Sequence, residues 1–192
     1  MASHDSSNED LMASLDRTIA GVDRLIAGVE AHQWTSPTPC TEWNVRAVVD
    51  HLVSGNLYFA ALVRDEPRPD RNPEQLADDP IDAYRSAAAT MRAAFAAPGV
   101  LERTYQSSIG PAPGSILVHL RITELLVHGW DLARATGQPA ELPADLAEQE
   151  LALWRSRFGD GLSDGLPFAP AQTVAAEAPA IDRLAAFLGR QV

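Results

Sequence analysis

Apolar residues recur at three- and four-residue steps over long stretches of the chain, which predicts amphipathic helices. The first stretch covers about residues 11–29, with charged residues between its apolar positions. The proline-containing segment 36–40 ends it, because a proline lacks an amide donor and disfavours helical geometry in the residue before it. Thr41 is a plausible N-cap for a second helix that runs to about Val63. The chain therefore opens with two helices of bundle length.

A third helix is expected to start at Asp79 and Pro80. An aspartate can cap the free amides of a helix start, and a proline suits the first helical position. Pro98 and Gly99 end this helix. Residues 100–114 contain Val, Thr and Tyr and then a run of Gly and Pro, which predicts a short strand or hairpin before a tight turn.

A fourth helix is expected after Ser115, ending at Gly137, a residue suited to a left-handed cap. Shorter helices should follow Pro143 and Pro179, with a Gly- and Pro-rich loop at 159–178 between them that could cover a site as a lid. Long amphipathic helices with few strand signals predict an all-α bundle. In such a bundle, polar residues that point inward usually form the functional site.

The length of 192 residues suits one domain, so we expect residues 1–192 to form a single unit. The polar opening, residues 1–8, is expected to be disordered, and it does not resemble a secretory signal. No apolar run is long enough to span a membrane. These features predict a soluble, cytoplasmic protein.

The formal net charge is −11, and no basic cluster interrupts it. Such a surface would repel phosphate backbones and anionic lipids, so nucleic acid and membranes are not expected as partners. The single cysteine, Cys40, cannot form an internal disulfide or a cysteine-based zinc knuckle. Any metal site must therefore be built from histidines and carboxylates.

Three ionisable residues share one face of the fourth predicted helix. Successive helical residues turn by about 100°, so Glu124 and His128 lie about 40° apart around the axis, and Asp131 lies within about 20° of Glu124. Leu117 and Leu120 continue the same line, which marks it as the side that faces the core. A buried carboxylate and imidazole are costly unless they are paired or coordinate a cation.

His51 on the second helix could supply a third ligand from across the bundle. Two histidines and one carboxylate leave a coordination position open, as in catalytic zinc sites, and nickel, iron or manganese would also accept these ligands. Asp131 would orient an imidazole or act as a local base. The alternative is a hydrogen-bonded core pair of Glu124 and His128, because this composition readily produces such a spacing.

Other residues have less specific interpretations. Arg121 could bind a substrate carboxylate or make a surface ion pair. His119 lies about 140° around the helix from Glu124 and should point elsewhere. Cys40 is expected to be a packed turn residue, and Trp130 and Tyr58 are expected to pack or to line a pocket.

Two motifs resemble the DinB/YfiT-like superfamily: the string 37–46 that leads to His51, and Glu124 followed by 128–137. They look like the actinobacterial metal-binding branch that is similar to mycothiol-dependent maleylpyruvate isomerase. The resemblance implies an up-down-down-up four-helix bundle, here with short extra C-terminal helices. It also implies a zinc-type site of His51, Glu124 and His128, and often chemistry that uses mycothiol.

In an enzyme of this kind the metal would bind the thiol sulfur and lower its pKa, and the thiolate would attack an electrophile. The leading hypothesis is therefore a metal-dependent thiol S-transferase or isomerase, with a small thiol and an electrophilic substrate as partners. The alternatives are a metal- or small-ligand-binding protein without turnover, and a metal-free bundle with a scaffolding or partner-binding role. The identity of the substrate is left open, since it need not be maleylpyruvate. The protein could be a monomer or a homodimer.

Overall fold

The computed structural model of the protein describes residues 2–67, 69, 79–159 and 169–192, with side chains from residue 7 onward. Helices dominate this part of the chain. The elements in order are α1 (Ala2–Ala27), the 3-10 helix η1 (Ala31–Gln33), α2 (Val45–Arg64), α3 (Pro80–Phe95), β1 (Thr104–Ser107), β2 (Gly110–Pro113), α4 (Gly114–Thr136), α5 (Ala144–Phe158) and α6 (Ala180–Phe187).

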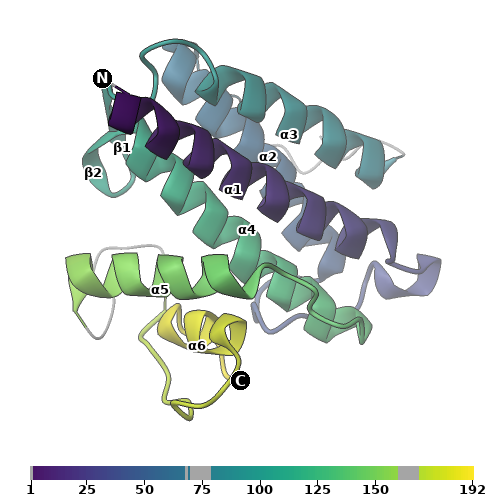
Figure 1. The fold of residues 1–192 in the computed structure, drawn as a ribbon. Coiled ribbons are helices and arrows are strands. Elements are labelled where there is room, and N and C mark those ends of the chain that lie inside the picture. The colour runs from purple at the N-terminus through teal and green to yellow at the C-terminus, as the bar shows by residue number, and fades with distance from the viewer. Residues whose placement is uncertain (1, 68, 70–78, 160–168) are drawn as a thin grey trace.

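Four of these helices form a bundle in which α1 packs on α4 and α2 packs on α3. Helices α1 and α4 run in one direction and α2 and α3 in the other (Figure 1), which is the up-down-down-up order. The two short helices α5 and α6 pack on each other and on α4. The predicted all-α four-helix bundle with short extra C-terminal helices is confirmed.

Several predicted helix ends are confirmed, and each is determined by residues close to it in the sequence. The Asp79 side chain accepts hydrogen bonds from the amides of Ile81 and Asp82 at the start of α3. Gly137 ends α4 in the left-handed conformation, with φ of 70°. Helices α5 and α6 begin directly after prolines, and the expected hairpin at 100–114 is the antiparallel pair β1 and β2.

The predicted start of the second helix at Thr41 is wrong. Asn44 caps α2 instead, and its side chain accepts a hydrogen bond from the amide of Ala47. Pro37 and Asn44 form a β-bridge that closes a turn around Thr41, so the chain reverses there before it becomes helical. This pairing links residues seven apart, which a local helix signal does not reveal.

Helix α1 begins at Ala2, whereas we expected residues 1–8 to be disordered. The Asn8 side chain donates a hydrogen bond to Glu102. Of the loop predicted at 159–178, residues 160–168 lie outside the described residues, and 169–178 contain no helix or strand.

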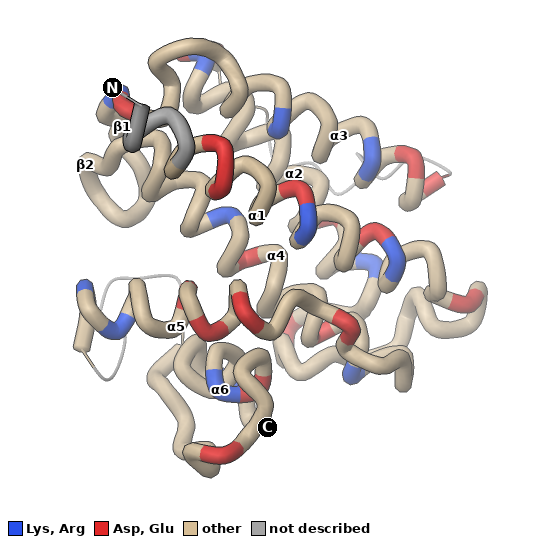
Figure 2. The backbone as a smooth tube through the Cα atoms, viewed as in Figure 1, with Lys and Arg blue, Asp and Glu red and all other residues tan. Residues whose placement is uncertain are grey.

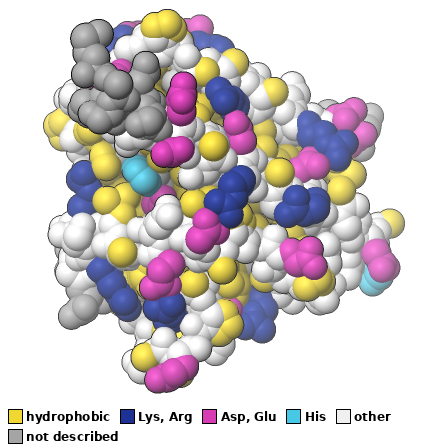
Figure 3. Space-filling model, viewed as in Figure 1, with side chains coloured by type: hydrophobic (Ala, Val, Ile, Leu, Met, Phe, Trp, Pro, Cys, Tyr) yellow, Lys and Arg dark blue, Asp and Glu magenta, His cyan; other side chains and the backbone are white. Residues whose placement is uncertain are grey.

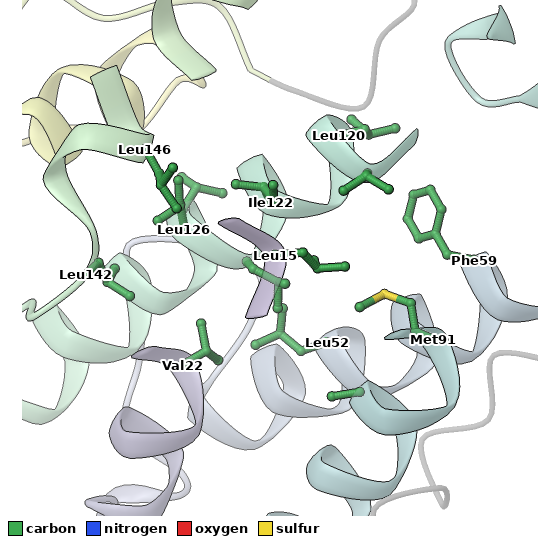
Figure 4. Packing of buried hydrophobic residues seen from close by; sticks show 14 of the residues in the cluster. Leu15, Val22, Leu52, Phe59, Met91, Leu120, Ile122, Leu126, Leu142 and Leu146 are labelled. Atoms are coloured by element: carbon green, nitrogen blue, oxygen red, sulfur yellow. The ribbon is translucent and has the colours of Figure 1, made fainter. Parts of the chain in front are cut away.

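Side chains from all four bundle helices meet in one core (Figure 4). Leu15 of α1, Leu52 of α2, Met91 of α3 and Ile122 of α4 are each fully buried. Leu142 and Leu146 extend this core toward α5. The burial of this apolar surface holds α2 and α4 at a fixed separation, which positions the residues that point from them into the pocket described below.

Charged residues on the outside pair between helices. Asp16 and Asp23 on α1 bind Arg92 and Arg85 on α3 at 3.0 and 2.7 Å. Figure 2 shows acidic and basic positions along both helices. The space-filling view in Figure 3 shows acidic and basic side chains interspersed on this face. No helix in the described part of the chain is long and apolar enough to cross a membrane.

Tyr84 on α3 is fully buried, and burial raises the pKa of its hydroxyl well above the ordinary value of 10.0. Above about pH 10 the unfolded chain would ionise this tyrosine while the folded chain keeps it neutral, so folding stability falls as pH rises. Wild-type protein should therefore lose more unfolding free energy than Tyr84→Phe between pH 9 and pH 11, as measured by urea denaturation. Equal losses of unfolding free energy in the two proteins would contradict a raised pKa for Tyr84.

Candidate functional site

A cavity of about 790 Å³ lies where the turn before α2, the helices α2 and α4, and the C-terminal segment meet. The turn supplies Trp43, α2 supplies His51, and α4 supplies Glu124 and His128. Gly189 to Gln191, after α6, line the other side. Residues distant in the sequence thus face one space.

The two histidines of this pocket lie against each other. The ring centroids of His51 and His128 are 4.9 Å apart, and the ring planes are inclined by 68°. The indole of Trp43 contacts both, with centroid distances of 4.6 Å to His51 and 5.6 Å to His128. Three rings from three separate segments therefore form one wall of the cavity.

Glu124 lies one turn before His128 and is held by Arg121. The Nη1 of Arg121 donates to Oε2 of Glu124 at 2.8 Å, and the glutamate side chain is 18% exposed. A guanidinium at this distance makes a charge-assisted hydrogen bond and fixes the direction of the carboxylate. Glu124 therefore presents a fixed oxygen donor to the pocket.

Arg121 itself is fully buried and does not line the cavity. Its Nε donates to Oδ1 of Asn56 at 2.9 Å, and its Nη2 donates to the carbonyl of Leu52 at 2.7 Å. Gly55 makes room for this arrangement, because a Cβ there would lie 2.7 Å from Nη1 of Arg121. Arg121 thus makes a buried ion pair, where we had considered a surface ion pair, and its predicted contact with a substrate carboxylate has no support in this geometry.

Asp131 lies behind His128 and is fully buried. The Nδ1 of His128 bonds to Oδ2 of Asp131 at 3.0 Å, and Arg190 donates to both carboxylate oxygens, from Nε at 3.2 Å and from Nη2 at 2.9 Å. Burial, the largest influence, would raise the pKa of Asp131, but the hydrogen bonds and charges of His128 and Arg190 together bring it below its ordinary value. Asp131 is therefore an ionised acceptor that leaves Nε2 of His128 available to the cavity.

The donor types in this pocket suit a divalent cation. With a metal–nitrogen distance of about 2.1 Å, each imidazole centroid lies about 3.2 Å from the metal, so two rings at a tetrahedral angle have centroids about 5.2 Å apart. The separation of 4.9 Å between His51 and His128 is close to this value. A carboxylate on the second nitrogen of a ligating histidine, as on His128, is also usual. Within the described residues, however, no set of three or more His, Cys, Asp or Glu side chains already stands in a metal-binding arrangement.

The structure thus brings His51, Glu124 and His128 to one cavity and places Asp131 behind it. His119 points elsewhere, as expected, and its Nδ1 bonds to Glu150 at 2.8 Å.

Two aromatic residues considered for the pocket, Trp130 and Tyr58, do not line it. The Nε1 of Trp130 donates to Asp182 at 2.7 Å, which ties α4 to α6.

Cys40 lines the cavity and is half-buried. Burial, the largest influence, raises the pKa of its thiol, and the nearby charge of Arg190 only partly opposes this. Because the thiolate is the reactive form, a raised pKa fits the expected packed residue.

Sequence analysis missed Arg190 and the position of Trp43. The only local signal for Trp43 is its place in the motif before α2. Arg190 follows Asp131 by 59 residues, so no local period connects them.

The fold and the pocket together define the class of protein: a helical bundle with two imidazoles and a carboxylate at one cavity. Residues 15–133 match the family model described as the mycothiol maleylpyruvate isomerase N-terminal domain, and the chain belongs to this family.

Curated relatives include the uncharacterized proteins MT0763 and Rv0738 of Mycobacterium tuberculosis, strains CDC 1551 / Oshkosh and H37Rv. Each is 39% identical over 165 residues, which cover 85% of this chain and 88% of the relative.

Solved structures with a similar fold include the mycothiol-dependent maleylpyruvate isomerase, with a TM-score of 0.65, and a mutant of that isomerase, with 0.63. The sequence identities are 16% and 15%, and each match covers 80% of this chain and 73% of the other. At this identity the likeness establishes the fold.

The room beside Gly55 can be tested by Gly55→Ala. Arg121 is fixed by three hydrogen bonds, so it cannot move aside without breaking one, and the variant should lose about 1–3 kcal/mol of unfolding free energy. Gly21→Ala is the matched control, because a Cβ at that helical glycine would lie 3.2 Å from the tip of Leu142 and 3.8 Å from its next neighbours, Glu141 and Pro143. Urea denaturation of both variants measures the difference, and equal stability would show that Arg121 yields freely.

Proposed function

We propose that the protein is a metal-dependent thiol S-transferase or isomerase that uses mycothiol or a similar small thiol. The observation that carries this proposal is the pair of imidazoles, His51 and His128, beside the carboxylate of Glu124 at one cavity. Family membership and the similarity in fold to the mycothiol-dependent maleylpyruvate isomerase support the use of such a thiol.

We assign His51, Glu124 and His128 as the ligands of the metal, with zinc as the expected ion and nickel, iron or manganese as alternatives. A divalent cation held by two histidines and one carboxylate supplies Lewis acidity, which lowers the pKa of a thiol. Arg121 directs the carboxylate of Glu124, and Asp131 keeps the proton of His128 on Nδ1.

Of the two roles considered for Asp131, its contacts favour orientation of His128 over action as a local base. The carboxylate is fully buried, and both oxygens already accept hydrogen bonds from Arg190. A group that is inaccessible and has a lowered pKa is a weak base at neutral pH. Arg121 likewise acts through Glu124, since its own donors are engaged by the protein.

The cavity of about 790 Å³ is large enough for a drug-sized molecule. Its aromatic wall of Trp43 and the two imidazoles offers apolar contact, and Gln172 and Gln191 offer hydrogen bonds. A small thiol and an electrophile are therefore the proposed partners. A cytoplasmic location belongs to the same proposal, because reducing surroundings keep such a thiol reduced.

The alternative function is binding of a metal or a small ligand without turnover. The observation that favours it is the burial of Asp131, the residue considered as a local base, whose two oxygens both accept hydrogen bonds from Arg190.

Metal binding is tested by zinc titration of the purified protein after chelator treatment. Wild-type protein should bind one equivalent, and His51→Ala, Glu124→Ala and His128→Ala should each weaken binding by more than the roughly 10- to 100-fold that loss of an outer partner causes. His119→Ala is the matched control, because it removes an imidazole from α4 outside the cavity. Full occupancy in all three ligand variants would refute the assignment.

Turnover is tested with zinc-loaded protein and mycothiol. With maleylpyruvate the isomerised product is measured, because isomerisation returns the thiol unchanged, and with chlorodinitrobenzene the thioether product is measured, because transfer consumes the thiol and releases chloride. We expect catalytic product formation that is lost in His128→Ala and retained in His119→Ala. Saturable mycothiol binding without product from any electrophile would instead support the binding function.

A further inference from the structure

We infer that Arg190 is a positioning residue of this pocket, which fixes the carboxylate of Asp131 and, through it, the imidazole of His128. The inference rests on the proposed function in one respect, because that function makes His128 a metal ligand. The contacts themselves are independent of any metal or substrate.

The bond between Arg190 and Asp131 is a forked one. Nε donates to Oδ1 at 3.2 Å and Nη2 donates to Oδ2 at 2.9 Å, so one guanidinium holds both carboxylate oxygens. Oδ2 also forms a hydrogen bond with Nδ1 of His128 at 3.0 Å. Because one rigid fork sets the carboxylate plane, it also sets the direction in which Asp131 holds the His128 ring.

The backbone after α6 directs Arg190 toward α4. Gly189 adopts the left-handed conformation, with φ of 88°, and its amide bonds to the carbonyl of Ala186 at 3.0 Å, while the amide of Arg190 bonds to that of Ala185 at 2.9 Å. These two bonds form the Schellman ending of a helix. A Cβ at Gly189 would lie 2.7 Å from the carbonyl oxygen of Ala169. Arg190 is thus placed by a defined helix ending.

A comparison within the same segment separates Arg190 from an ordinary ion pair. Arg183 on α6 binds Glu148, whose side chain is 54% exposed, and neither residue lines the cavity. Arg190 is itself 10% exposed, pairs with a fully buried carboxylate, and lines the cavity beside His128. The loss of Arg183 should affect only the surface, whereas the loss of Arg190 should affect the pocket.

Arg190→Lys tests the inference, because lysine keeps the charge but cannot make the fork. Arg183→Lys is the matched control, and circular dichroism verifies that both variants are folded. The first readout is nitrogen-15 NMR of the metal-free proteins at neutral pH, with the His128 signal assigned by its absence in His128→Ala. We expect one Nδ1–H tautomer in wild type and in Arg183→Lys, and mixed or broadened signals in Arg190→Lys.

The second readout is zinc affinity, which should fall by about 10- to 100-fold in Arg190→Lys and stay unchanged in Arg183→Lys. If wild-type protein binds no zinc, the proposed metal function fails, and the NMR result alone decides the role of Arg190. A folded Arg190→Lys protein with the wild-type His128 spectrum would overturn the inference. Arg190→Gln, which also removes the charge, should show an equal or larger change, and a wild-type spectrum in it would overturn the inference as well.

Discussion

The buried carboxylate of Asp131 is the constraint on which the site depends. A charge without access to water is tolerated only when strong donors surround it, and loss of one partner from such a pair typically costs about 3–5 kcal/mol. The donors here come from two places, His128 on α4 and Arg190 beyond α6. The need to satisfy one carboxylate therefore joins the C-terminal segment to the bundle and gives the cavity its second wall.

The same physical solution occurs twice on α4. Glu124 is held by Arg121, and His128 is held by Asp131 with Arg190 behind it. In both cases the side chain that faces the cavity is oriented by a residue farther from it. A pocket built in this way keeps its geometry when it is empty, which lowers the entropic cost of binding a ligand.

Much of the fold could be predicted from the sequence, because it depends on local patterns: apolar periodicity, the Asp79 cap, and Gly137 after α4. The start of α2 could not, since a bridge between Pro37 and Asn44 decides it. The grouping of Glu124, His128 and Asp131 followed from the helical repeat. The burial of Arg121 could not be predicted, because the space for its side chain depends on Gly55 in another helix. The role of Arg190 could not be predicted either, because no helical repeat connects it with Asp131, the residue it binds.

The contact of Trp43 with both imidazoles makes the optical properties of this indole sensitive to the state of the site. Its ring is 4.6 Å from that of His51 and 5.6 Å from that of His128, whereas Trp130 and Trp154 are buried elsewhere with their Nε1 groups bonded to Asp182 and Thr123. A cation or a charged imidazole beside an aromatic face interacts with its electrons directly. The protein thus contains its own fluorescent reporter in the wall of the cavity.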